Sequence, residues 1–295
     1  MPVAFLPSPS HGVWHLGPVP VRGYALCMVA GIMVTVWLAD RRYRGLGGPP
    51  GLILDVAIWA VPCGLAGARL YSVITDYELY FGHGHDWLRI LQIWNGGLGI
   101  PGAIAGGLLG AWAVCRRSMI SLGPVVGAAA PPIAFGLAIG NWGNWFSQQL
   151  YGRPSTLAWA VEISPAHRVP GYENYATFQP LFGYESLWDI FVGLAVIWAA
   201  RRFRLSGDRV FALWAAAYAL GKYGTESLRI DFAHHVLGLR VNQWLLLAAF
   251  AGALAYLYVA RAKRDVVPVA AGPPGAEVSA AGQGGQEIHT DVVST

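Results

Sequence analysis

The sequence is poor in charge. Asp, Glu, Lys and Arg make up 12% of its 295 residues, whereas about a quarter of the residues in an ordinary soluble domain are charged. Hydrophobic residues make up 55%. A soluble protein of this composition would need one very large core with almost no hydrated surface. The composition therefore excludes an ordinary soluble domain and favours an integral membrane protein.

Cysteine is also scarce. The three cysteines, Cys27, Cys63 and Cys115, lie inside apolar runs and lack the spacing of metal ligands. We expect them to be small buried hydrophobic residues, and we expect no metal centre, cofactor or nucleic-acid partner. A cleavable signal peptide is not apparent either, because the first charge is Arg22 in a Pro-rich segment, so the first apolar run is expected to act as an uncleaved signal.

Long apolar runs are abundant, and several approach the ~20 residues with which a helix crosses a bilayer. The 13 Trp and 38 Gly are also typical of membrane proteins. We predict an all-α integral membrane protein with seven transmembrane helices. Their approximate ranges are Tyr24–Ala39, Gly51–Thr75, Gly96–Cys115, Gly123–Ile139, Leu181–Ala200, Val210–Thr225 and Val241–Ala260.

Basic residues indicate the direction of the chain. Twelve of the 20 Lys and Arg residues follow the first, third, fifth or seventh run, and positive charge marks the cytoplasmic side. We therefore predict the N-terminus outside and the C-terminus in the cytoplasm. Residues 1–265 form the predicted membrane domain, residues 141–180 an outward-facing loop or head, and residues 266–295 a disordered cytoplasmic tail. No internal repeat is apparent, which argues against an inverted-repeat transporter.

The stretch "IGNWGNWFSQQLYGRPST" places amides, a Tyr and an Arg directly after an apolar run. Other polar residues also fall within or beside apolar runs, where they are costly and are functional candidates. By the predicted topology they gather toward the outer leaflet. These residues are Arg22, Tyr24, Arg69, Asn141, Asn144, Arg153, Glu185, Lys222, Glu226 and Arg229.

The spacing of Tyr218, Lys222, Glu226 and Arg229 predicts one helical face. Ion pairs between helices would explain such a face, and so would a site for an anionic phosphate with a polar headgroup, since Arg binds phosphate oxygens and amides bind hydroxyls. Gly96 and Gly97 could allow the backbone to approach a lipid headgroup, whereas Gly106, Gly107 and Gly110 favour close helix packing. Together these residues favour binding of a phospholipid from the outer leaflet.

Six segments, in this order, resemble the prolipoprotein diacylglyceryl transferase family. They are "LGPVPVRGYAL", "GLAGARLYSV", "IWNGGLGIPGAIAGG", "GNWGNWFSQQLYGRP", "PLFGYESLW" and "KYGTESLRIDFAHHVLGLRVNQW". The resemblance covers roughly Pro7 to Lys263. It implies a multi-pass enzyme of the bacterial plasma membrane that moves a diacylglyceryl group from phosphatidylglycerol to the lipobox cysteine of a preprolipoprotein. The products would be a thioether and glycerol phosphate.

The resemblance also implies roles for particular residues. Arg69, Arg153 and Arg229 would surround the phosphate, Asn144 and Tyr24 would contact the headgroup, Glu226 would orient the cations, and Tyr218 would handle a proton. Arg22, Gly152 and Glu185 match the family's pattern as well. The residues expected to be catalytic are Tyr218, Arg229, Glu226 and Asn144. Those expected to bind substrate are Tyr24, Arg22, Arg69, Asn141, Gly152, Arg153, Glu185, Lys222, Gly96 and Gly97.

The chain departs from the family's pattern at several of these places. Asn141 and Lys222 stand where the family has Arg, and Pro101 and Gln179 stand where many members have His. The pattern N-x-E before Leu-Tyr-Gly becomes Ser147-Gln148-Gln149. Three functions remain open: an active transferase, a catalytically impaired relative that binds lipid or lipoprotein without transfer, and a transporter or channel. Polar groups on one side only argue against the last.

Overall fold

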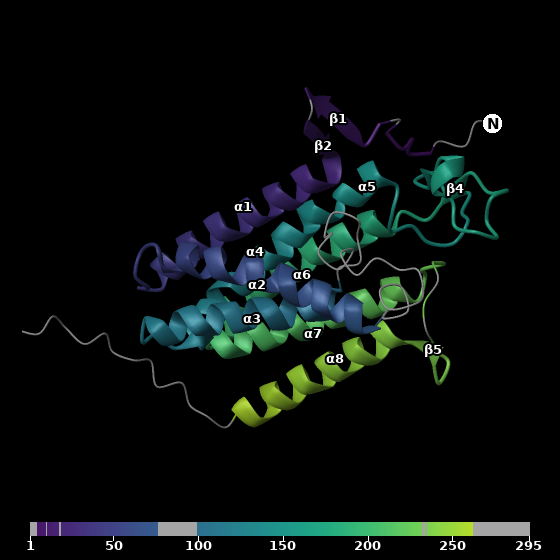
Figure 1. Ribbon diagram of the computed structural model, residues 1–295. Helices are drawn as coiled ribbons and strands as arrows, with labels where there is room; N and C mark the ends of the chain where they lie inside the picture. Colours follow the sequence, from purple (N-terminus) through teal and green to yellow (C-terminus); the bar gives the residue numbers. More distant parts are fainter. Residues whose placement is uncertain are drawn as a thin grey trace, which may run out of the picture. The chain divides into compact units, whose positions relative to one another are not determined.

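The computed structural model describes residues 5–9, 11–17, 19–75, 99–231, 233 and 235–261, and this part of the chain is mostly helical. Figure 1 shows its long helices lying side by side. Within the described residues, seven helices have 18 residues or more. They are α1 (Gly23–Gly45), α2 (Leu52–Thr75), α3 (Ile100–Arg117), α4 (Leu122–Asn141), α6 (Leu181–Phe203), α7 (Gly207–Glu226) and α8 (Val241–Ala260). They overlap the seven predicted ranges.

Five of these helices, namely α1, α2, α4, α6 and α8, are long and apolar enough to cross a membrane. Such helices define an integral membrane protein. The helix ends differ from the apolar runs where charge follows. For example, α1 continues through Arg41, Arg42 and Arg44 to Gly45, because Arg ends an apolar run but is itself a good helix former. The seven crossings and their direction remain predictions.

Glycines bring helix backbones into contact. A Cβ atom on Gly67 of α2 would lie 2.3 Å from the carbonyl oxygen of Gly102 on α3, and one on Gly106 would lie 2.2 Å from the oxygen of Cys63. A Cβ atom on Gly110 would also lie 2.9 Å from the Cα atom of Ala60 on α2. Small residues at such contacts let apolar helices pack without side chains between them. The expected packing role of Gly106 and Gly110 is confirmed.

The helices α4, α6 and α7 share a buried core, and so their ends are fixed relative to one another. Ala134 of α4, Val192 of α6 and Trp214 of α7 are among its fully buried members. Because α6 runs antiparallel to α4 and α7, the end of α4, the start of α6 and the end of α7 lie together (Figure 1). The sequence-predicted polar residues Asn141 and Glu185 lie at this end.

Short strands lie at the end of the helices that carries Asn141 and Glu185, and the all-α prediction missed them. Among the described residues, three antiparallel pairs form: β1 (Val13–Leu16) with β2 (Val19–Arg22), β3 (Val161–Glu162) with β4 (Thr177–Phe178), and β5 (His235–Val236) with β6 (Leu239–Arg240). Figure 1 places β1, β4 and β5 beyond the start of α1 and α8. Strands of two to four residues are too short to show an alternating pattern in the sequence.

Residues 142–180 form an ordered head and not an irregular loop. The head contains α5 (Gly143–Ser147), the β3–β4 pair and a 3-10 helix, Pro165–His167. Tyr151, Ile163 and Phe178 form its small buried core. The chain near Leu6 pairs with Val161 alongside this sheet. Phe182 at the start of α6 belongs to the same core, so the head is packed onto the end of the helices where the polar residues gather.

Candidate functional site

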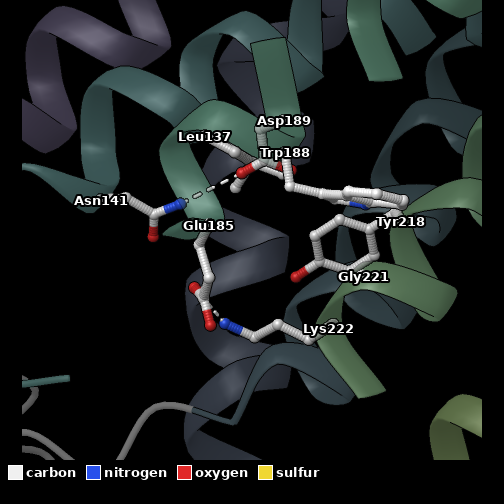
Figure 2. Close-up of a pocket in the computed structure, with 8 residues that line it drawn as sticks. All are labelled: Leu137, Asn141, Glu185, Trp188, Asp189, Tyr218, Gly221 and Lys222. Atoms are coloured by element: carbon white, nitrogen blue, oxygen red, sulfur yellow. Dashed lines mark hydrogen bonds and ion pairs between the residues drawn. The ribbon is translucent and has the colours of Figure 1, made fainter. Parts of the chain in front are cut away.

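A small cavity opens between the end of α4, the start of α6 and the end of α7. Its volume is about 50 Å³, and both polar and apolar side chains line it (Figure 2). The lining residues are Leu137 and Asn141 from α4, Glu185, Trp188 and Asp189 from α6, and Tyr218, Gly221 and Lys222 from α7. Four of the sequence-predicted site residues, Asn141, Glu185, Tyr218 and Lys222, therefore meet around one cavity.

Glu185 forms a buried ion pair with Lys222. The Nζ of Lys222 lies 2.6 Å from Oε2 of Glu185, and the two side chains are 13% and 5% exposed. The hydroxyl of Thr225 donates a second hydrogen bond, 2.8 Å long, to Oε1. A buried carboxylate needs such partners on both oxygens, because its desolvation is otherwise uncompensated. Lys222 is thus engaged by Glu185.

Asn141 is bound to a second carboxylate of α6. Its Nδ2 donates a 3.1 Å hydrogen bond to Oδ2 of Asp189, which is 3% exposed. In Figure 2 the amide nitrogen faces Asp189, and the amide oxygen points away from it. Asn141 is one of the residues that the sequence predicts to bind substrate. The structure instead directs this donor toward a neighbouring acid.

The aromatic wall of the cavity fixes Tyr218. Its ring stacks on Trp214 at a centroid distance of 5.6 Å, and its hydroxyl end points into the cavity in Figure 2. Trp188 is held by a 3.0 Å hydrogen bond from Nε1 to the oxygen of Ala217. A Cβ atom on Gly221 would lie 2.0 Å from that nitrogen. Glycine at 221 is therefore required for Trp188 to lie against α7.

A second cluster follows directly after α7, and we call it the arginine–carboxylate network. It consists of Glu226, Arg229, Asp231 and Arg240. Arg240 Nη1 lies 3.0 Å from Oε1 of Glu226, and Arg229 Nη1 lies 3.2 Å from Oε2. Arg229 also donates to both oxygens of Asp231, at 2.9 and 2.6 Å. Two guanidinium groups and two carboxylates are thus joined, with formal charges that sum to zero.

Hydrogen bonds within the network shift the pKa values of two members that lie outside the helices, Asp231 and Arg229. Burial acts to raise the pKa of Asp231, but hydrogen bonds and charge from Arg229 and Arg240 outweigh it and hold that pKa below its ordinary value. Burial likewise acts to lower the pKa of Arg229, but Glu226 and Asp231 outweigh it and raise that pKa. Both groups therefore remain charged at neutral pH.

Gly152 connects the head to this network. It forms an isolated antiparallel bridge with Arg229, and its N–H donates a 2.9 Å hydrogen bond to the oxygen of Gln179. A Cβ atom on Gly152 would lie 3.0 Å from the oxygen of Leu228. Glycine at 152 therefore lets the head pack directly against the chain that carries Arg229.

Four further predicted residues belong neither to the cavity lining nor to the arginine–carboxylate network. Asn144 donates from Nδ2 to the oxygen of Asn141 and so braces the turn after α4. The backbone of Tyr24 packs on Gly143. Arg22 ends β2. Arg69 is buried in α2.

Three predicted site residues lie outside both clusters or outside the described residues, and their roles stay predictions. Arg153 is exposed on the head and belongs neither to the cavity lining nor to the network, because its backbone pairs with Gln179 along the head's sheet edge. Gly96 and Gly97 lie outside the described residues.

Sequence reasoning missed Asp189, Thr225, Asp231 and Arg240. A signal for Asp189 was present, since it follows Glu185 by four residues on an apolar helix and so faces the same side. Arg240 gave no comparable signal. It is distant from Glu226 in the sequence, and the β5–β6 hairpin, in which His235 pairs with Arg240, returns it to the network.

Apolar helices, buried ion pairs and an ordered head define an integral membrane protein with a polar site at one end of its helices. The family described as prolipoprotein diacylglyceryl transferase matches residues 11–259. The chain belongs to this family.

Its relatives include two proteins of Streptomyces coelicolor, named phosphatidylglycerol–prolipoprotein diacylglyceryl transferase 1 and 2. The first is 52% identical over 99% of this chain and 84% of its own length. The second is 54% identical over 88% and 82%, respectively. A transferase of the same name from Streptomyces avermitilis is 52% identical over 90% of this chain and 77% of its own.

Proposed function

We propose that this protein transfers the diacylglyceryl group of phosphatidylglycerol to the lipobox cysteine thiol of preprolipoproteins. The observation that carries this proposal is the identity of 52–54% to transferases named for this reaction, over nearly the whole chain. The head and both polar clusters fall inside the region that the family matches. The transfer joins the cysteine sulfur to a glycerol carbon and releases glycerol phosphate.

The chemistry sets two tasks for the site. The thiol must lose its proton, because the thiolate is the nucleophile and an unperturbed thiol has a pKa of ~8.5. As the S–C bond forms, the C–O bond to the phosphate breaks, and the phosphate leaves with the electron pair. Cations held in a water-poor site stabilise the charge that develops on that group. The substrates need no cofactor for this exchange.

Arg229 is the residue best suited to the phosphate. Its guanidinium lies at the head–helix junction, is oriented by Glu226 and is partly exposed. Tyr218 faces the neighbouring cavity and is the candidate for moving a proton. Asn144, Tyr24 and Gly152 lie at the same end and would shape the headgroup site, together with Arg22 and Arg69.

The placement of the charges supports the proposed orientation in the bacterial plasma membrane. Arg residues fill the last turns of α1, α3 and α6, at the opposite end of the helices from the site. Positive charge marks the cytoplasmic side, so the site and the N-terminus would face the outer leaflet, with the C-terminus in the cytoplasm. Residues 1–265 would form the seven-span transferase domain, and residues 266–295 a disordered tail.

The departures from the family's pattern at Asn141, Lys222 and Pro101 favour one second candidate, a relative that binds phospholipid without transfer. Purified protein in phosphatidylglycerol micelles, mixed with a lipobox peptide, separates the two by mass spectrometry. We expect the mass of a diacylglyceryl group on the cysteine peptide and no increment on a matched Cys→Ser peptide. Lipid binding without the increment would establish the second candidate and reject the transferase.

A further inference from the structure

Asp231 is the most exposed member of the arginine–carboxylate network. Its side chain is 40% exposed, whereas that of Glu226 is 3% exposed. It holds Arg229 through two parallel hydrogen bonds, from Nε to Oδ1 at 2.9 Å and from Nη2 to Oδ2 at 2.6 Å. This is the two-pronged geometry in which a guanidinium also binds phosphate. The face of Arg229 that a phosphate would use is therefore occupied by a carboxylate.

The charge balance of the network also disfavours phosphate binding while the Asp231 carboxylate stays on Arg229. With Glu226, Asp231, Arg229 and Arg240 together, the formal charge is zero, and an anionic phosphate gains little from such a group. If the Asp231 carboxylate turns toward solvent, the remaining three residues carry one net positive charge. That charge matches the single negative charge of a phosphodiester. Exchange of one anion for the other keeps the buried guanidinium groups paired throughout.

The backbone of Asp231 is held independently of its side chain. Nη2 of Arg240 donates to the Asp231 carbonyl oxygen, and Arg240 is in turn fixed by Gln243, whose Oε1 accepts from the Arg240 N–H at 2.9 Å. Gln243 also donates to the hydroxyl of Ser227. Oδ1 of Asp231 also accepts from Nη1 and Nη2 of Arg240, each at 3.2 Å. The carboxylate can therefore leave both guanidinium groups by rotation of its own side chain, while Arg240 stays bonded to Glu226 and to the Asp231 carbonyl oxygen.

We propose that Asp231 occupies the phosphate position on Arg229 in the lipid-free protein, and that the phosphate of the donor lipid displaces it. Asp231 is thus a residue that sets the affinity for anionic lipid and not a group that reacts. This inference rests on the proposed function, because it places the phosphate of the donor at Arg229. It predicts that removing the carboxylate strengthens donor binding.

The test measures phosphatidylglycerol binding and transfer kinetics for the wild type and for Asp231→Asn in the same detergent. We expect a Kd and a KM for phosphatidylglycerol about three- to tenfold lower in the variant, with kcat little changed, because the binding-competent arrangement no longer competes with an internal anion. The matched control is Glu173→Gln. It removes an equal charge from an exposed side chain of the head and should leave both constants at wild-type values.

Two results would contradict the displacement of Asp231 by phosphate. An unchanged or raised Kd in folded Asp231→Asn would overturn the displacement and make Asp231 a structural clamp. Asp231→Ser serves as a second variant, and failure of both to fold would overturn it too, since a displaceable carboxylate cannot be indispensable. Wild-type protein that binds the lipid but performs no transfer would defeat the proposed function alone. The binding comparison would still decide the role of Asp231.

Discussion

Asn141 on α4 and Asp189 on α6 are joined by a 3.1 Å hydrogen bond from the amide nitrogen to the carboxylate. Asn141 stands where the resemblance to the family places an Arg. The structure shows that a buried acid lies directly beside this position. A guanidinium introduced there would therefore meet an existing carboxylate and would not be buried without a partner.

Asn141→Arg is accordingly expected to speed the transfer. A guanidinium has five N–H donors, so it can bind Asp189 and still direct donors toward the leaving phosphate, more than the amide of Asn141 can offer. A gain of ~1–2 kcal/mol in transition-state stabilisation corresponds to a roughly five- to thirtyfold faster reaction. Transfer assays on the wild type and the variant side by side measure it. The double variant Asn141→Arg/Asp189→Asn should lose stability relative to Asn141→Arg. Equal or lower activity in well-folded Asn141→Arg would reject the idea that Asn141 limits stabilisation of the leaving phosphate.

Arg229→Ala should abolish transfer while the protein still inserts into the membrane. Loss of one charged hydrogen bond in a desolvated site costs ~2–4 kcal/mol of transition-state stabilisation. The assay is the mass increment on the lipobox peptide, with insertion checked by membrane fractionation. Arg44→Ala is the control, because it removes an exposed ion pair with Asp40 at the other end of the helices. Activity of Arg229→Ala within about threefold of the wild type would assign Arg229 a structural role.

Glu185→Gln should destabilise the folded protein. It leaves the ammonium of Lys222 buried without its carboxylate, and breaking a buried ion pair on one side typically costs ~3–5 kcal/mol. Thermal unfolding in detergent measures the change. Glu185→Gln/Lys222→Met should recover most of the loss, because both charges are then gone. If the single variant unfolds at the wild-type temperature, the pair contributes nothing to stability.

Truncation after Asp265 should leave membrane insertion and lipid binding intact. Residues 268–295 are rich in Gly, Ala and Pro and have no periodic apolar face to bury. Membrane fractionation and phosphatidylglycerol binding of the shortened chain test this expectation. Loss of either property would show that the tail packs on the helices.

Much of the candidate site could be predicted from the sequence because charge inside apolar segments is rare and costly. Glu185, Tyr218 and Lys222 stood out for this reason, and the structure brings them around one cavity. The predicted single face from Tyr218 to Arg229 is divided, however. Lys222 pairs with Glu185, and Glu226 pairs with Arg229 and Arg240. Helical spacing indicates which side a residue faces, but not which partner on another helix it meets.

Hydropathy and motif order are local properties of the chain, and for this reason the helices, the membrane class and the family could be predicted from them. The partners of the polar groups could not, because they depend on the tertiary structure. Asp189 meets Asn141 because α4 and α6 share a core, and Arg240 meets Glu226 because the β5–β6 hairpin turns the chain back. Such pairings depend on how helices cross and where short hairpins turn, and these are settled by packing between segments far apart in the chain.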